Sequence, residues 1–514
     1  MSDLFEERHA KLEALIEGGI NPYPSAFEDR MPISEARDLA PPAPEEEGAP
    51  PPDPGPTVRV AGRIMRRRNF GKMIFVDLSD EHGALQVMVR KNDVGEEFHK
   101  LVRKQLDDGD FLGIEGPIGR SKTGEVTVFA TGGQVLSKSL RPLPEKWHGL
   151  TDADLRVRYR YVDLLANPDV RKQFALRSHV VQETRRILND QAFLEVETPL
   201  LHPIAGGALA RPFVTHHNTL DLELYLRIAP ELYLKRLLVG GFEKVFEIGR
   251  VFRNEGISPR HNPEFTMLEL YWAYVDWQAV MNLTEDLITA LAAKYCEGGK
   301  TSLGGRDIPL TGPFHRRPYH DLVEEHAGVD PRDPDALAAR MKELKIKDPG
   351  LGPAKMLDEL FEETVIPKLI EPTFVTHYPT ELCPLSKNNV EDPSVCDRFE
   401  LFVNTWELAN AFSELNDPLD QRRRFEEQVA SRDPESAAEV DEDYLRALEH
   451  GMPPAAGLGI GIDRLVMVLG GFESIRETIL FPLRRPTQQQ QAEAGEQEAG
   501  EEPARESAEG GGAG

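Results

Sequence analysis

The sequence predicts an α+β protein with more than one domain, and three features of the chain lead to this prediction. First, 514 residues are more than one hydrophobic core usually holds, so the chain should divide. Second, residues 57–139 carry five short β runs separated by glycine turns. Third, residues 174–188 have helical spacing, whereas residues 244–274 and 399–417 each read as a pair of strands.

The composition limits the kind of partner. The chain has 60 Lys and Arg against 87 Asp and Glu, which gives a net charge of −27. This balance argues against a general nucleic-acid or membrane binder, so any basic surface must be local. Cys296, Cys383 and Cys396 form no CxxC pair and no zinc pattern, which indicates a reducing, cytoplasmic compartment. No apolar run approaches the roughly 18 residues of a membrane span, and the acidic amino terminus is unlike a targeting peptide, so we expect no membrane part.

The two ends of the chain differ from its middle. Residues 1 to about 20 are expected to form an amphipathic helix, and the proline-rich, acidic segment 41–56 should not fold, so residues 1–56 are a helix and linker. Residues 487–514 lack aromatic and β-branched apolar residues, which predicts a disordered acidic tail.

The five β runs suit a small five-stranded barrel of the OB type over residues 57–145. A local basic patch lies in its first part, at Arg63, Arg66, Arg67, Arg68 and Lys72, with Phe75 just beyond. OB barrels bind single-stranded nucleic acid with this combination, cations for the backbone and a ring for base stacking. The alternative, a barrel that binds no nucleic acid and an arginine run that is a solvated edge, stays open on these residues alone.

In the pair of strands at 244–274, the second strand separates two kinds of side chain. Alternation places Phe265, Met267, Glu269 and Tyr271 on one face, and Thr266, Leu268, Leu270 and Trp272 on the opposite, core-like face. Arg253 ends the first strand, and the loop adds Arg260 and His261. These groups suit a nucleotide, with guanidinium on phosphate and a ring on the base. An ordinary solvated hairpin is the alternative, but it leaves a glutamate among exposed aromatic rings unexplained.

The hairpin at 399–417 should turn near Asn404, and its second arm places Asn410, Phe412 and Glu414 on one face. Glu400 and Glu407 lie on opposite arms, where they are suited to hold a hard cation. Strict alternation, however, puts Glu407 on the face opposite Glu414. Glu407 and Glu414 can contact one site only if the strand contains a bulge or if the ligand is large enough to reach both side chains. From the residues alone, solvated carboxylates are the simpler interpretation of Glu400 and Glu407.

Two glycine-rich segments are suited to close contact with a ligand. The first, residues 204–213, is a glycine turn that lets the backbone approach a ligand. The second, residues 457–470, is a glycine-alternating strand that runs into an apolar helix with Arg464 at the junction. Its glycine face leaves room for a planar ring, although the spacing is a poor match to the dinucleotide fingerprint.

These segments together carry a family resemblance. The chain resembles motif 2 of class II aminoacyl-tRNA synthetases in the segment FRNEGI and the following RHNPEFTMLELYWAY. The residues there are similar to those of the lysyl enzymes. The glycine-rich segment 457–470, followed by ETILFPLRRP, resembles motif 3, and the helix, strand and proline up to Pro199 resemble motif 1. The resemblance covers nearly all of residues 57–486. It implies an OB anticodon-binding domain and then, over 150–486, a catalytic domain with an antiparallel sheet flanked by helices and an insertion at about 312–380.

The resemblance also implies an activity: lysine and ATP form lysyl-adenylate, and the lysyl group passes to the 3′ end of tRNA(Lys), in a homodimer formed through the motif 1 helix and strand. Arg253 and Arg464 would be catalytic, and Mg²⁺ would be held by Glu400 and Glu407. The lysine site would comprise Gly207, Glu231, Glu269, Tyr271, Asn410, Phe412 and Glu414. The ATP site would comprise Arg253, Glu255, His261, Asn262, Phe265, Glu400, Glu407, Gly461 and Arg464. The anticodon would contact Arg63, Phe75, Gln86 and Glu125.

Three alternatives share parts of this layout. An aspartyl or asparaginyl synthetase needs cations for its substrate, whereas this face carries Glu269 and Glu414. A lysyl-transferring paralogue with a non-tRNA acceptor would lack the OB barrel or carry a membrane part. An inactive RNA-binding relative would be expected to have lost Arg253, Arg464 or the metal glutamates, and the sequence retains all of them.

Overall fold

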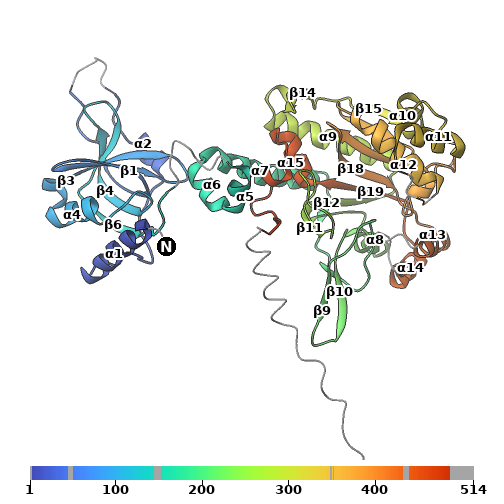
Figure 1. Ribbon diagram of the computed structural model, residues 1–514, viewed down its shortest axis with the longest axis horizontal. Coiled ribbons are helices and arrows are strands. Elements are labelled where there is room, and N and C mark those ends of the chain that lie inside the picture. The colour runs from blue at the N-terminus through green and yellow to red at the C-terminus, as the bar shows by residue number, and fades with distance from the viewer. Residues whose placement is uncertain are drawn as a thin grey trace, which may run out of the picture. The chain divides into compact units, whose positions relative to one another are not determined.

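The computed structural model describes residues 3–43, 50–143, 152–347, 350, 352–431 and 439–486. The predicted tail and part of the predicted linker lie outside these residues. The chain divides between Thr151 and Asp152 into two compact units (Figure 1). Each unit has its own hydrophobic core.

The first unit is a β-barrel with one strand more than expected. Its strands are β1 (Thr57–Phe70), β2 (Met73–Ser79), β3 (Ala84–Arg90), β4 (Phe111–Arg120), β5 (Val126–Phe129) and β6 (Gly132–Ser137). They are ordered β1-β2-β3-β5-β4-β6, and an additional pairing of β1 with β4 closes the barrel. The five predicted runs correspond to β1–β5. The sixth strand was missed because it begins with Gly132 and Gly133, which weaken any strand pattern.

Among the described residues of this unit the helices are α1 (Asp3–Glu17), α2 (Ile33–Asp38), α3 (Lys91–Val94) and α4 (Glu96–Lys104). The predicted amino-terminal helix is therefore present and ends at Glu17. Alternate strand residues such as Ile74, Val76 and Leu78 are fully buried inside the barrel.

The second unit is built on the sheet that carries β12, β18 and β19 in Figure 1. The eight strands of this sheet have the order β15-β16-β17-β18-β19-β12-β11-β7. Its strands are β7 (Leu194–Glu195), β11 (Lys244–Phe252), β12 (Glu264–Ala273), β15 (His315–Pro318), β16 (Thr373–Thr376), β17 (Arg398–Val403), β18 (Trp406–Ser413) and β19 (Ala455–Gly461). The pairings are antiparallel except at the two ends, where β15–β16 and β11–β7 are parallel. The predicted α+β class is confirmed. The strand expected in motif 1 is β7 and spans only Leu194–Glu195.

The predicted insertion at 312–380 is not separate from this sheet, because its two ends are the strands β15 and β16. The helices between these strands form an apolar cluster around Leu322, Leu360 and Phe361, which also includes Val375 of β16 and Phe402 of β17.

The helices of the second unit are α5 (Ala153–Arg158), α6 (Arg160–Ala166), α7 (Pro168–Asp190), α8 (Glu231–Val239), α9 (Trp277–Tyr295), α10 (Tyr319–Ala327), α11 (Pro334–Leu344), α12 (Pro353–Thr364), α13 (Pro418–Ser431), α14 (Glu442–Glu449) and α15 (Ile462–Gly470). Smaller elements are the strands β8 (Leu201–His202), β9 (Val214–His217), β10 (Leu222–Leu226), β13 (Lys300–Leu303) and β14 (Arg306–Pro309), with short 3-10 turns at Glu297–Gly299, Ile366–Lys368, Thr380–Leu382 and Ile475–Glu477. Helices α7, α9 and α15 pack on one face of the sheet around Leu268 and Leu270, which leaves the other face for a site. No helix among the described residues is long and apolar enough to cross a membrane.

The hairpin of β17 and β18 contains the bulge that the predicted metal pair requires. Leu401 pairs with Ala409, but the next residue, Phe402, pairs with Glu407, so Leu408 is the extra residue. Leu408 and Ala409 both join the hydrophobic core, and Glu407 turns back to the cavity side. The turn itself is Asn404-Thr405, with φ values of 49° and 66° that suit a tight two-residue hairpin.

Candidate active site

A cavity of about 460 Å³ lies on the exposed face of the sheet, where β12, β18 and β19 adjoin α8. Most residues predicted to contact lysine or ATP line it. They are Gly207, Glu231, Arg253, Glu255, His261, Asn262, Phe265, Glu269, Tyr271, Glu407, Asn410, Phe412, Gly461 and Arg464. Two predicted residues do not line it: Glu414 lies just behind the wall, and Glu400 lines an adjoining cavity of about 1230 Å³.

The glycines of β19 determine how deep this cavity is. A Cβ atom at Gly457 would lie 2.2 Å from Oε1 of Glu414 and 2.5 Å from the ring of Tyr271. Glycine at this position therefore makes room for the protein's own side chains, where we had expected room for a ligand ring. At Gly461 the nearest atom to an added Cβ is 3.9 Å away, so the backbone there is open to the cavity.

Buried carboxylates crowd the inner end of the cavity. Glu269 is 4% exposed and accepts a hydrogen bond of 3.2 Å from the hydroxyl of Tyr271. Burial, reinforced by the negative charge of Glu231, raises the pKa of Glu269 to about 8. Burial also raises the pKa of Glu414 to about 8, although the ammonium group of Lys235 opposes this shift. Such carboxylates gain from any cation that enters beside them, so the inner end is suited to a positively charged ligand.

Lys235 of α8 is a site residue that the sequence prediction missed. Its Nζ atom lies 2.6 Å from Oε1 of Glu231 and also forms an ion pair with Oε2 of Glu414, and its side chain is fully buried. The centre of the Phe412 ring lies 5.4 Å from Nζ of Lys235. The i,i+4 spacing of Glu231 and Lys235 on a helix is a recognisable pattern and would have predicted the first contact.

Two arginines lie at the outer end. Arg253 follows β11 directly, its guanidinium carbon is 5.3 Å from the centre of the Phe265 ring, and burial lowers its pKa. Arg464 donates a hydrogen bond of 2.8 Å to the carbonyl oxygen of Glu407, and its second terminal nitrogen is 3.0 Å from Nε2 of His261. Both guanidinium groups therefore face the same space, as anion binding requires.

The loop between β11 and β12 is held in place by its own polar groups. The Asn262 amide donates a hydrogen bond of 2.6 Å to the carbonyl oxygen of Glu264, and Nδ1 of His261 lies 2.8 Å from the hydroxyl of Ser258. Burial lowers the pKa of His261, and the positive charge of Arg464 lowers it further. A neutral His261 therefore faces Arg464.

Glu400 and Glu407 face the adjoining cavity together because of the bulge in β18. Glu400 accepts hydrogen bonds from Arg398 at 2.5 Å and from the hydroxyl of Tyr378 at 2.7 Å. Burial and the nearby charge of Glu407 together raise the pKa of Glu400 to about 7, although the positive charge of Arg398 opposes this shift. Two close carboxylates of this kind fit a divalent cation. In the described part of the chain no group of three or more His, Cys, Asp or Glu side chains is arranged to hold a metal, so its other ligands would be water and substrate oxygens.

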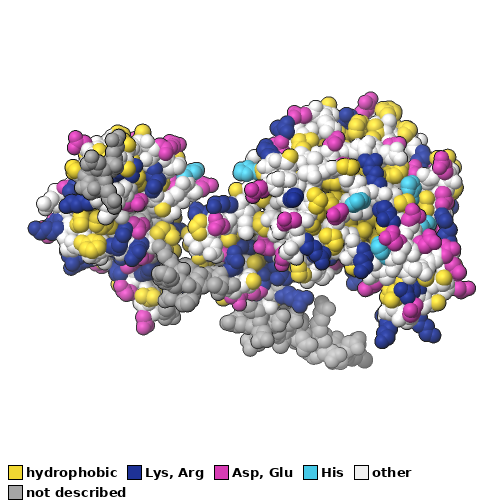
Figure 2. Space-filling view, turned by 90° about the horizontal axis from the view of Figure 1, so that it is seen from above, with side chains coloured by type: hydrophobic (Ala, Val, Ile, Leu, Met, Phe, Trp, Pro, Cys, Tyr) yellow, Lys and Arg dark blue, Asp and Glu magenta, His cyan; other side chains and the backbone are white. Residues whose placement is uncertain are grey.

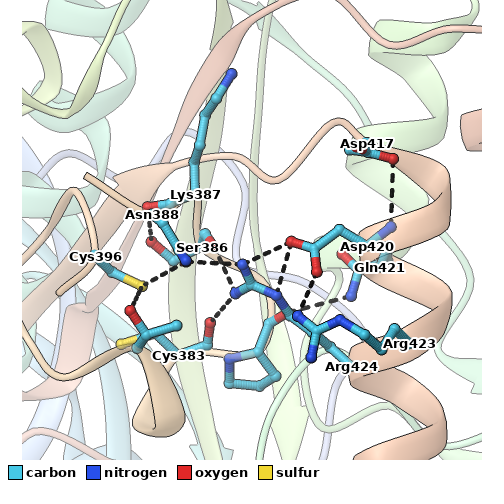
Figure 3. A network of polar contacts seen from close by, with 12 residues as sticks. Cys383, Ser386, Lys387, Asn388, Cys396, Asp417, Asp420, Gln421, Arg423 and Arg424 are labelled. Carbon is cyan, nitrogen blue, oxygen red and sulfur yellow. Dashed lines mark hydrogen bonds and ion pairs between the residues drawn. The ribbon is translucent and has the colours of Figure 1, made fainter. Parts of the chain in front are cut away.

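The loop from Leu382 to Ser386 forms a further wall of the cavity, and Arg424 of α13 fixes it (Figure 3). Arg424 donates hydrogen bonds to the carbonyl oxygens of Cys383 at 3.1 Å and Ser386 at 2.9 Å, and it pairs with Asp420. Arg398 connects this wall to the rest of the site, because it donates hydrogen bonds to Sγ of Cys383 and to Oδ1 of Asn410. Sequence reasoning missed this wall because its contacts join distant segments.

The predicted anticodon residues of the first unit lie mostly on one face of the barrel. Phe75 pairs with Met88, and Gln86 pairs with Asp77, so Phe75 and Gln86 share a face. Thr127 connects Gln86 to Glu125, because its hydroxyl lies 3.0 Å from Oε1 of Gln86 and 2.9 Å from the carbonyl oxygen of Glu125.

The basic patch is less free than the sequence suggested. Arg63 donates a hydrogen bond of 2.8 Å to the carbonyl oxygen of Gly109 and stacks on the Phe111 ring. Arg67 faces Asp107 and Asp108, and Arg68 pairs with Asp77 while its guanidinium lies near the Phe75 ring. On the face of the molecule shown in Figure 2, basic and acidic side chains are interspersed, which agrees with a basic surface that is only local.

Comparison with known proteins gives the same division of the chain. Residues 58–136 match a family model described as an OB-fold nucleic acid binding domain, and residues 152–485 match one described as tRNA synthetases class II (D, K and N). A lysine–tRNA ligase of Carboxydothermus hydrogenoformans is 51% identical over 95% of this chain and 99% of its own length. Lysine–tRNA ligases of Pelotomaculum thermopropionicum and Moorella thermoacetica are 51% and 49% identical, each over 95% of this chain. The chain therefore belongs to the class II tRNA synthetases of the D, K and N group.

Proposed function

We propose that this protein is a lysine–tRNA ligase, which activates L-lysine with ATP and transfers the lysyl group to the 3′ end of tRNA(Lys). The observation that carries the proposal is the charge of the cavity. Three buried carboxylates, Glu231, Glu269 and Glu414, lie at the inner end, where Glu231 and Glu414 hold the ammonium group of Lys235, and two arginines face the outer end. The relatives named above support the same activity.

Lysine fits the inner end by charge. Its ε-ammonium group would lie among Glu269, Glu414 and the hydroxyl of Tyr271, beside Asn410 and Phe412. Glu231 would receive its α-amino group, with Gly207 close by; Gly207 has a φ of 89° and could not carry a Cβ without meeting Glu231 and Ala229 at 3.3 Å. A pocket that hydrogen-bonds and neutralises a charged substrate rejects apolar analogues without an editing step.

ATP fits the outer end. Phe265 would stack on adenine, with Glu255, His261 and Asn262 around the ring and the Gly461 backbone open beneath. Arg253 would bridge the lysine carboxylate and the α-phosphate, and Arg464 would hold the far phosphates. A carboxylate oxygen of lysine then attacks the α-phosphorus, and pyrophosphate leaves; in the second step the terminal ribose 3′-hydroxyl attacks the lysyl carbonyl and AMP leaves. The protein acts by positioning and charge neutralisation rather than as a nucleophile.

Glu400 and Glu407 would hold Mg²⁺, which supplies positive charge to the triphosphate when bound. Replacing Glu407 with glutamine should raise the Mg²⁺ concentration for half-maximal ATP–pyrophosphate exchange about tenfold, because one of two carboxylate ligands becomes neutral. The measurement is a Mg²⁺ titration of exchange at saturating lysine. Glu371→Gln, which removes an exposed carboxylate outside both cavities, is the control; an unchanged Mg²⁺ requirement for the Glu407 variant would remove the metal assignment.

The OB barrel would read the anticodon with Phe75, Gln86 and Glu125 on one face. Phe75→Ala should reduce kcat/KM for tRNA about 10- to 100-fold, because one base–ring stack contributes roughly 1–3 kcal/mol. Lysine-dependent exchange without tRNA should not change, since the ring is in the other unit. Phe5→Ala, an aromatic on α1 that stacks on His9, is the matched control. Equal aminoacylation by the Phe75 variant and the parent would contradict this assignment.

A homodimer would form along the β7 end of the large sheet. Apolar side chains are exposed there on β7 and on the strands and turns near it, including Leu194, Leu200 and Leu201, each between 44% and 49% exposed. An uncovered apolar set of this kind is typical of an interface. Analytical ultracentrifugation should give a mass of about twice 57.6 kDa.

The direct test of the function is ATP–pyrophosphate exchange with each of the twenty amino acids, followed by aminoacylation of total tRNA. Lysine alone should support exchange, and tRNA(Lys) alone should be charged. Exchange driven by aspartate or asparagine instead would establish the neighbouring specificity.

A further inference from the structure

The fully buried Lys235 is unusual because it is a cation inside a pocket that is proposed to bind cations. Its ammonium group is held by Glu231 on its own helix and by Glu414, which follows β18. The two carboxylates come from different elements, α8 and the end of β18, so one nitrogen atom that pairs with both fixes their separation. Its own charge is secure, because those carboxylates raise the pKa of Lys235 far above its ordinary value in spite of burial.

Other charged and titratable groups also face this ion triplet. The hydroxyl of Tyr444 comes from α14, and Glu269 and Tyr271 come from β12. Tyr444 and Tyr271 stay neutral, because burial raises the pKa of each phenol. Arg227 also acts on Glu269 and Arg236 on Tyr444, but each arginine is paired with a carboxylate, Glu247 and Asp441 respectively, so neither ion pair adds net charge. The net charge of the inner end is therefore set by Glu231, Glu269, Glu414 and Lys235.

These charges balance when the proposed substrate is added. With every carboxylate ionised, the pocket carries three negative charges and one positive charge from Lys235. Arg253 adds a positive charge that the lysine carboxylate cancels, and the two ammonium groups of lysine supply the remaining two charges. The sum is zero, so each buried carboxylate has a cation, which a buried site of low polarity requires.

We propose that Lys235 is a positioning residue that sets the specificity of the pocket: its ammonium group fixes the separation of Glu231 and Glu414 and leaves a deficit of two positive charges, which matches the two ammonium groups of free lysine. This inference rests on the proposed function. Lys235 acts through these carboxylates and does not line the cavity itself.

Removing this charge should weaken lysine binding in a way that depends on pH. In Lys235→Met the carboxylates of Glu231 and Glu414 lose the ammonium group between them, so one of them stays protonated and no longer offers a charged partner to the substrate. We expect the KM for lysine to rise about 100-fold near neutral pH, with KM for ATP within roughly threefold of the parent and kcat reduced less than about tenfold.

The pH dependence of the KM for lysine distinguishes an electrostatic role of Lys235 from a role in packing alone. The pKa of Glu414 is about 8 with Lys235 present and must rise when Lys235 is removed. Above about pH 8 the parent pocket is therefore ionised, whereas the variant still gains binding as pH rises. The ratio of the two KM values should fall above about pH 8. Deprotonation of free lysine affects both proteins equally and cancels in this ratio.

The experiment measures lysine-dependent ATP–pyrophosphate exchange from pH 7 to pH 9 for the parent, Lys235→Met and Lys235→Gln. Lys235→Gln removes the charge but keeps hydrogen-bonding capacity, in case the methionine variant does not fold. Lys138→Met is the matched control: Lys138 is also fully buried between two carboxylates, Asp107 and Asp110, but in the other unit. It should leave the KM for lysine unchanged.

The outcomes are distinct. A parent protein without lysine-dependent exchange would overturn the proposed function itself. With an active parent, a KM ratio that is near one, or raised but flat with pH, would overturn the role of Lys235. If neither Lys235 variant folds while Lys138→Met does, Lys235 serves stability alone and the proposal also fails.

Discussion

Arg253→Ala should abolish lysine-dependent ATP–pyrophosphate exchange, with a loss of at least about 1000-fold. Arg253 lies at the end of β11, between the carboxylate-lined inner end and the outer end that faces Arg464 and His261. From there one guanidinium group would neutralise both the attacking carboxylate and the α-phosphate. Without it two anions would have to approach each other in a partly dry cavity, where charge repulsion is strong. The measurement is exchange at saturating lysine and ATP.

Arg250→Ala is the matched control for this prediction. Arg250 lies in β11, three residues before Arg253, but forms an ion pair of 3.5 Å with the exposed Glu264 outside the cavity, so its loss should leave exchange near the parent rate. Pyrophosphate exchange that persists in Arg253→Ala would show that the guanidinium does not bridge the substrates.

Glu414→Gln should slow lysine activation at least about 100-fold while KM for ATP stays near the parent value. Glu414 is 1% exposed, and it lies against Gly457 at the inner end, away from the arginines. Glutamine keeps the shape but removes the charge, so both the substrate ammonium and Lys235 lose a buried partner. Breaking a buried ion pair costs about 3–5 kcal/mol, which corresponds to a loss of 100-fold or more.

Steady-state exchange with lysine and ATP varied independently measures this effect. Glu264→Gln, on the same sheet but exposed at the start of β12 and outside the cavity, should behave like the parent. An activation rate for Glu414→Gln equal to that of the parent would remove Glu414 from the lysine site.

The parts of the site that follow from local pattern could be predicted from the sequence. Alternation in β12 correctly separated Glu269 and Tyr271, which face the cavity, from Leu268 and Leu270, which are in the core. The same pattern failed at Glu407, because alternation alone cannot reveal an extra residue such as Leu408; the bulge is defined by pairing with the neighbouring strand.

Contacts between distant segments could not be predicted in this way. Lys235 meets Glu414, Arg398 reaches Cys383, and Arg424 fixes the loop that contains Ser386, and none of these partners is local in sequence. Each interaction depends on how α8, α13 and the β17–β18 hairpin are placed by the sheet, which tertiary packing decides.

The most direct test of a pocket that selects by positive charge compares lysine with norleucine, which has a similar chain but no ε-ammonium group. Exchange with the parent protein should favour lysine by at least about 1000-fold in kcat/KM, because norleucine leaves Glu269 and Glu414 without their cation. Equal exchange with both amino acids would contradict the account.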